Sequence, residues 1–387
     1  MKILLIPSSY LPILGGLQEA VYHLAKAFKD QGYDVTVVTN RYPRHLKKRE
    51  IIDGIHIERM LFAGFYLSSF SYILKYVAGL LIGGINFFRL MLLLSKRKPD
   101  AVNVHFLGSH APYAMLATKL LGIRCVVSLH GDDVEGLPHR SSIDCWLFKK
   151  VLLAADYVTA CSNYLLNEAK KIVPEIELKS TAIWNGINLA EYQNIEPYKH
   201  PHPYIFAAGR LVYKKGFDVL LRSYRQLIDE GQKIDLILAG NGPEKDNLMM
   251  QAKELSLPAI IRNSQTHETD NQELITSSLI FWGRADRDEM KSLMKGCELF
   301  VIPSRKEPFG IVALEAFASG KKVVASNTGG LTEIIRDGIN GYFVEAGNAE
   351  DLESGIRKAL SDSSGDIRID LIETTWEKVS LQYLKIL

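Results

Sequence analysis

Two glutamates in the last third of the sequence stand where a predicted strand gives way to a helix. The apolar run 298–302 predicts the strand, and the chain continues from Pro303 to Gly320 as PSRKEPFGIVALEAFASG. Pro308 places Glu307 in the loop, because proline disfavours a helical conformation at the preceding residue. Glu315 lies in the helix that follows. Since one carboxylate accepts several hydrogen bonds, Glu307 is suited to sugar hydroxyls and Glu315 to the vicinal hydroxyls of a ribose.

The start of this helix is itself a candidate site. We expect it near Phe309 or Gly310, which makes the N–H groups of Phe309, Gly310 and Ile311 donors without a partner in the helix. Such groups bind phosphate. The alternative is that Glu307 only complements the helix dipole and Glu315 is an exposed helical residue. That alternative leaves the strand, the Pro-Phe-Gly start and the basic loop described next without an explanation.

A basic loop follows the predicted strand 204–208 and reads Gly209-Arg-Leu-Val-Tyr-Lys-Lys-Gly216. Arg210 and Lys215 are two cations between a strand and a helix, where they could neutralise a diphosphate, Arg210 as a bidentate donor and Lys215 as a point charge. A solvated basic turn is the alternative.

Two weaker signals occur in the first half of the sequence. Gly15 and Gly16 lie in the loop after the first predicted strand, where glycines let the backbone approach a ligand, although two glycines often mark only a turn. His130 closes the predicted strand 124–129, and the alternative role is structural. Asp132 and Asp133 follow it, and adjacent acids commonly cap a helix. We therefore predict no metal site.

Alternating strands and helices position these loops. Continuous apolar strands joined by helices indicate parallel sheets that are covered on both faces. The pattern runs twice, and a Pro-rich segment at 196–203 suits a linker. We predict an α/β protein with two doubly wound Rossmann-like domains facing across a cleft, at residues 1–196 and 203–372. Ligands of such sheets bind at the carboxyl ends of the strands, where the loops described above lie. The strands are expected at 2–6, 34–39, 101–106, 124–129, 156–160, 204–208, 235–239, 279–282, 298–302, 322–326 and 342–344.

Composition excludes several classes of protein. The 387 residues include 46 Lys and Arg against 44 Asp and Glu, so the overall charge demands no nucleic-acid partner. Four scattered cysteines without a CxxC pair fit a reducing, cytoplasmic location. The first apolar run is too short for a signal peptide.

Taken together, these motifs resemble those of the GT4 family of retaining glycosyltransferases, which have the two-Rossmann GT-B fold. The most specific part is Glu307 to Glu315, continuing to the segment Gly329–Ile335. The other motifs follow in the expected order, at 15–16, 130–133, 185–187, 209–216, 240–243 and 281–283. The ending around Trp376 resembles the family's last helix, which returns to the N-terminal domain and here comprises about residues 373–387.

The resemblance implies roles for individual residues. Gly16 would present its N–H to the donor diphosphate, Arg210 and Lys215 would bind the phosphates, and His130 would reach the transferred sugar. Glu307 would hold its hydroxyls and Glu315 the ribose. The donor is expected to be a UDP- or GDP-sugar and the enzyme to need no metal. Because no carboxylate is obviously placed for double displacement, we expect the transfer to proceed on one face of the sugar.

A strongly apolar segment, 60–94, bears on the acceptor. Basic clusters flank it, at 41–49 and 96–98. Its uncharged runs are shorter than the ~20 residues that a membrane span needs. Apolar anchors beside cations favour peripheral binding to an anionic membrane, at the inner face of the plasma membrane, and a lipid-linked or envelope-glycan acceptor. Packing of the segment in the core and a true span remain alternatives.

Three other functions stay open. A sugar phosphorylase or a nucleotide-sugar epimerase could use the same phosphate loops, and a non-catalytic protein could bind the sugar nucleotide without turnover.

Overall fold

The computed structural model describes the chain except residues 14, 63–72, 263–276 and 363–370, and except the side chains of 73–82. The described residues divide into two compact units. The first comprises Met1–Gly186 and Ile372–Leu387, and the second Ile187–Leu371. The Pro-rich stretch 196–203 therefore belongs to the second unit and is not the linker between the units. Its Tyr198 amide donates to the Ser292 carbonyl, which fixes it to that unit.

The first unit is built on an eight-stranded sheet in the order β3-β4-β2-β1-β5-β6-β7-β8. Neighbouring strands are parallel except for the pair β3–β4. The strands are β1 (Lys2–Pro7), β2 (Asp34–Asn40), β3 (Arg49–Ile52), β4 (Ile55–Met60), β5 (Ala101–His105), β6 (Arg124–Leu129), β7 (Tyr157–Ala160) and β8 (Ser180–Ala182). The hairpin β3–β4 and the short β8 lie outside the predicted set of strands.

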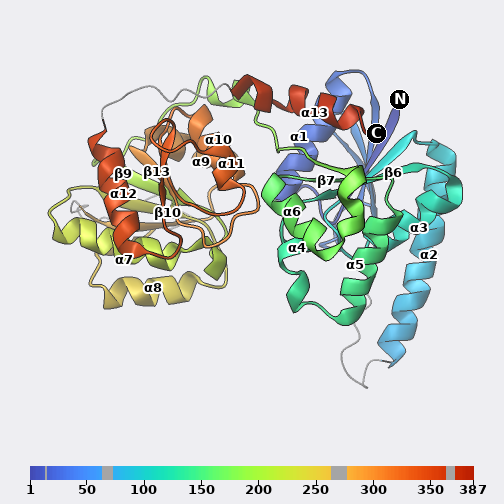
Figure 1. Cartoon of the computed structure of the whole chain (residues 1–387), viewed down its shortest axis with the longest axis horizontal. Coiled ribbons are helices and arrows are strands. Elements are labelled where there is room, and N and C mark those ends of the chain that lie inside the picture. The colour runs from blue at the N-terminus through green and yellow to red at the C-terminus, as the bar shows by residue number, and fades with distance from the viewer. Residues whose placement is uncertain (14, 63–72, 263–276, 363–370) are drawn as a thin grey trace. The chain divides into compact units, whose positions relative to one another are not determined.

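The helices of the first unit connect these strands in the α/β pattern (Figure 1). They are α1 (Gly16–Asp30), α2 (Ile73–Arg97), α3 (Ala111–Leu121), α4 (Asp132–Glu135), α5 (Ser142–Ala154), α6 (Asn163–Ile172) and α13 (Trp376–Leu384). Helix α13 packs on α1, and its Trp376, Val379 and Tyr383 join the core of the first unit. The chain thus returns to the first unit at its C-terminal end. The predicted apolar segment divides into part of β4, the residues 63–72 outside the described set, and α2.

The second unit has a seven-stranded, entirely parallel sheet in the order β11-β12-β10-β9-β13-β14-β15. The strands are β9 (Tyr204–Ala208), β10 (Asp235–Ala239), β11 (Ala259–Ile261), β12 (Leu279–Gly283), β13 (Leu299–Ile302), β14 (Val323–Ser326) and β15 (Gly341–Val344). The helices are α7 (Phe217–Asp229), α8 (Lys245–Glu254), α9 (Arg287–Gly296), α10 (Ile311–Ala318), α11 (Leu331–Ile334) and α12 (Ala349–Ser361). Most strands are buried along their whole length, as expected for a parallel sheet covered on both faces. The prediction of a two-sheet α/β architecture is confirmed.

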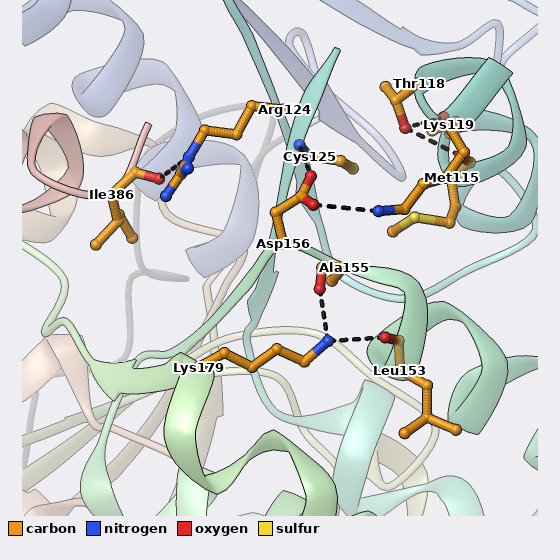
Figure 2. A network of polar contacts seen from close by, with 11 residues as sticks. Met115, Thr118, Lys119, Arg124, Cys125, Leu153, Ala155, Asp156, Lys179 and Ile386 are labelled. Atoms are coloured by element: carbon orange, nitrogen blue, oxygen red, sulfur yellow. Dashed lines mark hydrogen bonds and ion pairs between the residues drawn. The ribbon is translucent and has the colours of Figure 1, made fainter. Parts of the chain in front are cut away.

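A polar network secures the amino ends of β6 and β7 (Figure 2). The Asp156 carboxylate accepts hydrogen bonds from the Cys125 amide at 2.7 Å and from Lys119 Nζ at 3.1 Å. Lys179 Nζ donates to the carbonyls of Leu153 and Ala155 and so caps the end of α5. These bonds satisfy backbone groups at the amino ends of the strands, whereas the predicted ligand loops lie at the carboxyl ends. The four cysteines are free, and three of them are buried.

Candidate functional site

The basic loop of the second unit joins β9 to α7. Gly216 adopts the left-handed conformation at φ 68° and serves as the N-cap of α7. A Cβ at this position would collide with the Pro303 carbonyl oxygen, so glycine is needed for the close approach of the two loops. Arg210 is exposed, and the side chain of Lys215 is 20% exposed. The cations predicted to bind phosphate thus lie at the carboxyl end of β9, one open to solvent and one partly enclosed.

The predicted glutamate loop lies beside this basic loop. Lys215 Nζ donates to Glu307 Oε2 at 2.6 Å, and the Ser304 hydroxyl donates to the same oxygen at 3.0 Å. The Glu307 residue is only 6% exposed. A carboxylate buried this far requires a cation or several hydrogen bonds, and Lys215 supplies the cation. The sequence assigned Lys215 and Glu307 to different parts of the ligand; the structure brings them together as one ion pair.

A third segment fixes the backbone of Glu307. The Gly330 amide donates to the Glu307 carbonyl at 2.9 Å. A Cβ on Gly329, whose φ is 56°, would collide with that carbonyl oxygen, and a Cβ on Gly330 would come too close to Phe309 Cα. The Gly-Gly pair recognised in the sequence is therefore a packing requirement of the glutamate loop.

Arg305 was not singled out from the sequence. Its guanidinium makes two bonds to the Asp218 carboxylate, at 2.6 and 2.7 Å, and lies over the Tyr213 ring. This fork ties the glutamate loop to the first turn of α7 and holds the pKa of Asp218 below its ordinary value against the effect of burial. The feature of the sequence that could have identified Arg305 is its position as a basic residue two places before Glu307.

Helix α10 begins at Ile311, with Gly310 as its N-cap at φ 93°, slightly later than predicted. Phe309 and Gly310 are buried, and Ile311 is half-buried in the first turn. Glu315 lies in the second turn and is partly exposed. The start of α10 and Glu307 are consequently adjacent in the chain and in space, as an anion site next to a sugar site would require.

The first unit holds Gly15, Gly16 and His130. Gly16 is the first residue of α1, and Gly15 is its N-cap. Exposed N–H groups at such a start can meet an anion. The glycines thus lie at the start of α1, the helix that follows β1.

His130 follows β6 and pairs with a second histidine. His130 Nε2 lies 3.0 Å from Nδ1 of His105, the last residue of β5. Burial lowers the pKa of His130 to about 4 and that of His105 well below its ordinary value, where the neighbouring His130 adds to the effect. Both imidazoles are therefore neutral near pH 7. His105 was missed because nothing in the sequence indicates that adjacent strands bring the two rings together.

Asp133 holds the His130 loop from within. Its carboxylate accepts bonds from the amides of His130, Gly131 and Leu107, the closest at 2.8 Å. Burial raises its pKa, while these amide bonds oppose the rise. The sequence predicted a helix cap, but α4 has Gly131 as N-cap without a side-chain bond. Asp133 instead binds the loop that precedes the helix and joins it to the end of β5.

One cluster in the described residues has the composition of a metal site. His200 Nε2 and His202 Nδ1 lie 2.7 and 3.2 Å from Asp235 Oδ2, and the other carboxylate oxygen accepts from the Ser278 amide. His200 Nδ1 is buried without a hydrogen-bond partner in the described structure. A metal on Nε2 would force a hydrogen onto that nitrogen and leave a buried donor unsatisfied. The geometry favours a hydrogen-bonded anchor for the segment 198–203 over a metal centre.

Comparisons with known proteins agree with this architecture. Residues 14–191 match the model of Glycosyltransferase Family 4, and residues 190–375 match that of Glycosyl transferases group 1. The glycogen synthase of Mycobacterium tuberculosis is 27% identical over 94% of this chain and 86% of its own length. The N-acetyl-alpha-D-glucosaminyl L-malate synthase of Bacillus anthracis is 24% identical over 91% of this chain and 86% of its own.

Solved structures show the same fold. Sucrose-phosphate synthase from Thermosynechococcus elongatus superposes with a TM-score of 0.74 at 18% identity, over 100% of this chain and 98% of the other. Anabaena HepE in complex with UDP and glucose superposes with a TM-score of 0.67 at 20% identity, over 100% and 97%. With two adjoining family matches that span nearly the whole sequence, the chain belongs to the GT4-type glycosyltransferases of the GT-B fold.

Proposed function

We propose that the protein is a retaining, metal-independent hexosyltransferase that uses a nucleotide diphosphate sugar. The observation that carries this proposal is the ion pair of Lys215 with buried Glu307 next to the start of α10. A fixed cation, a carboxylate and a helix start side by side are suited to a diphosphate bonded to a sugar.

Each part of the donor has a candidate partner in this proposal. Arg210 and Lys215 bind the phosphates together with the N–H groups of Phe309, Gly310 and Ile311, and the Gly16 N–H is the candidate anion donor of the first unit. Glu307 accepts from sugar hydroxyls, and Glu315 accepts from the ribose. A UDP-sugar is the first donor to test, because the structurally similar Anabaena HepE was solved with UDP-glucose. A GDP-sugar is the second.

The catalytic contribution is positioning and stabilisation of the leaving diphosphate. Arg210 and Lys215 carry the positive charge that a divalent cation would otherwise supply. The acceptor hydroxyl attacks from the face that the diphosphate leaves, and the departing phosphate oxygen takes the hydroxyl proton. The anomeric configuration is thereby retained.

The acceptor is lipid-linked in this proposal, as in the assembly of envelope polysaccharide or lipopolysaccharide. Helix α3 packs against both α2 and α5, and all three expose large apolar side chains. These residues are Ile85, Phe88, Leu92, Leu116, Leu120, Ile143, Trp146 and Leu153. The same three helices also carry exposed lysines and arginines, including Arg89, Lys119 and Lys150. An apolar face with basic residues around it suits an anionic membrane surface, on the cytoplasmic side.

A cavity of about 410 Å³ lies between α3 and α5. Its walls include apolar Phe106, Leu147 and Val151 together with Arg140 and Ser109. Arg140 donates to the Leu107 and Asp132 carbonyls, so the cavity adjoins the loops that Asp133 fixes around His130. It offers the lipid-linked acceptor a mixed polar and apolar subsite next to the apolar face.

The donor is tested by a thermal-shift screen of UDP-, GDP- and ADP-sugars, since a ligand that binds the native state raises the melting temperature. Product NMR then gives the anomeric configuration. Retention in the presence of EDTA supports the proposal, and inversion or strict dependence on a divalent cation contradicts it. Product formation only with inorganic phosphate identifies a phosphorylase. Isomerised donor identifies an epimerase, and binding without hydrolysis or transfer identifies a non-catalytic protein.

Membrane association is tested by co-sedimentation with vesicles that contain anionic lipid. In the part of the chain that the structure describes, no helix is both long and apolar enough to span a bilayer. Phe88→Glu and Leu92→Glu are expected to reduce binding several-fold, because each side chain is about 70% exposed on α2. Leu178→Glu is the matched control, since Leu178 is exposed outside the three helices. Absence of wild-type binding to anionic vesicles overturns this part.

A further inference from the structure

The histidine pair of the first unit contains a choice between two hydrogen-bonded forms. His105 and His130 are joined through His105 Nδ1 and His130 Nε2 at 3.0 Å. Each neutral imidazole carries one hydrogen, on one of its two nitrogens. Either His105 donates to His130, or His130 donates to His105. The two forms present opposite chemistry at the remaining nitrogen of His130.

The surroundings of His105 distinguish these forms. His105 is 1% exposed, and its Nε2 is buried without a hydrogen-bond partner in the described structure. If His130 donated, His105 would carry its hydrogen on Nε2 and leave an orphaned buried N–H. If His105 donates from Nδ1, its Nε2 is only an unused acceptor. Orphaned N–H groups are the rarer of the two in folded proteins, which favours His105 as donor.

We propose that His105 is a positioning residue that donates Nδ1–H to His130 Nε2 and fixes His130 as the Nδ1–H tautomer. His130 then presents a neutral hydrogen-bond donor at Nδ1. Such a donor binds a hydroxyl or ring oxygen of the transferred sugar, and it cannot accept a proton at that nitrogen. The assignment of the sugar as the ligand rests on the function proposed above, whereas the tautomer itself does not.

Both rings are held by neighbouring elements. The Tyr383 ring of α13 lies with its centroid 6.3 Å from that of His105, and the Tyr383 hydroxyl bonds to Ser128 and Thr159. The His110 side chain bonds to the backbone of His105. Asp133 accepts from the His130 amide at 3.1 Å. The pair is therefore fixed from β5, β7, α13 and the loop after β6, so its geometry does not depend on a bound ligand.

Three substitutions at His105 separate the donor role from packing. In His105→Asn the side-chain amide places an N–H near the position of Nδ1, so the tautomer is kept. His105→Leu removes the donor, and His105→Asp replaces it with an acceptor that draws the hydrogen to His130 Nε2. We expect kcat to fall about 10- to 100-fold in the Leu and Asp variants, as for loss of a hydrogen bond at a reacting ligand. The Asn variant is expected to stay within about threefold of wild type.

The decisive measurement is ¹⁵N NMR of selectively labelled histidine, because protonated and bare imidazole nitrogens have well-separated shifts. The His130 signals are assigned by their loss in His130→Gln. We expect a protonated Nδ1 in the wild type and His105→Asn, and a protonated Nε2 in His105→Asp. A protonated Nε2 in the wild type overturns the proposal, and so does wild-type kcat in folded His105→Leu.

This spectrum needs no donor, acceptor or turnover. If the wild-type protein transfers no sugar, the proposed function fails while the tautomer is still decided. The wild-type and Asn spectra also remain decisive if the Leu and Asp variants do not fold.

Discussion

The two units hold their candidate site residues at the carboxyl ends of parallel strands by opposite electrostatic means. In the second unit, Lys215 and Glu307 form an ion pair at 2.6 Å. In the first, His105 and His130 form a pair that burial keeps neutral. The difference suits a charged group bound by one unit and uncharged hydroxyls bound by the other.

The supports of the two sites also differ. The glutamate loop is held by backbone contacts to Gly216, Gly329 and Gly330, which tolerate no side chain. The His130 loop is held by a side chain, the buried Asp133 carboxylate, which binds three amides. The support of the glutamate loop is therefore disrupted by adding a Cβ to one of these glycines. The support of the His130 loop is disrupted by removing the Asp133 carboxylate.

The largest expected effect is on the charged site. Lys215→Ala removes a cation that we propose to bind phosphate and leaves Glu307 as a buried carboxylate without its counter-charge. Arg210→Ala removes the second proposed phosphate cation. We expect each to reduce kcat by about two to four orders of magnitude, as for loss of leaving-group stabilisation. Steady-state turnover of the donor measures this. Lys306→Ala is the matched control, because Lys306 is an exposed cation of the neighbouring loop.

A double-mutant cycle sharpens the result. If Lys215 and Glu307 act as a pair, Lys215→Ala and Glu307→Ala combined cost less than the sum of the single effects. Near-wild-type turnover in both Lys215→Ala and Arg210→Ala removes the phosphate role.

The neutral site is expected to fail in acid. Burial lowers the pKa of His130 and of His110 to about 4 each, and it lowers that of His105 well below its ordinary value. Because the unfolded chain binds protons near pH 6.5 and the folded one does not, stability is complete above about pH 6.5 and falls towards pH 4. As the pH falls through that window, each such histidine lowers the free energy of unfolding by up to about 1.4 kcal/mol per pH unit.

Urea unfolding at several pH values tests this slope. His110→Asn should reduce it by up to about 1.4 kcal/mol per pH unit, because it removes one of these histidines. Asp133, whose pKa burial raises, holds its proton more firmly in the folded state than in the unfolded chain and so opposes the trend. An unfolding free energy that stays constant from pH 6.5 to 5 contradicts the neutral assignment.

The sequence predicted the fold through features that act locally. Apolar strands such as β9 and β10, and the loop position of Glu307 before Pro308, follow from backbone preferences and burial of neighbouring residues. Which motif residues contact one another does not follow from such local features. Lys215 and Glu307 are 92 positions apart, and their contact depends on the sheet order β9-β13, which single-sequence patterns leave undetermined.

His105 was missed for a related reason, whereas Asp133 was predicted as a helix cap and instead binds the amides of the preceding loop. His105 occupies the last position of an apolar strand, where its pattern is that of a core residue. Its partner becomes evident only when β5 and β6 are aligned, with His105 opposite Ser128 in the parallel register. The predicted linker was wrong because a Pro-rich segment also results from packing, here of His200 and His202 on Asp235.

A smaller effect is expected at Glu315. Glu315→Ala should weaken binding of the free nucleotide about 10- to 100-fold, by loss of hydrogen bonds between a carboxylate and the ribose hydroxyls. Isothermal titration calorimetry measures the affinity. The corresponding 2′-deoxynucleotide should lose affinity with the wild type and change little with the variant. Equal affinities for the wild type and Glu315→Ala would assign Glu315 to the helix alone.

The smallest expected change distinguishes Gly16, which is a candidate ligand contact, from Gly216, which the fold requires to be glycine. A Cβ on Gly16 meets nothing within 4 Å, so Gly16→Ala should alter the free energy of unfolding by less than about 0.5 kcal/mol. Gly216→Ala is the matched contrast, since its φ of 68° and the Pro303 carbonyl both oppose a side chain, and it should destabilise the protein by more than about 1 kcal/mol. If the Gly16 N–H approaches the diphosphate, Gly16→Ala should still raise the donor KM several-fold, because the added methyl group crowds the ligand and not the fold. An unchanged KM with intact stability would leave Gly16 as a helix start only.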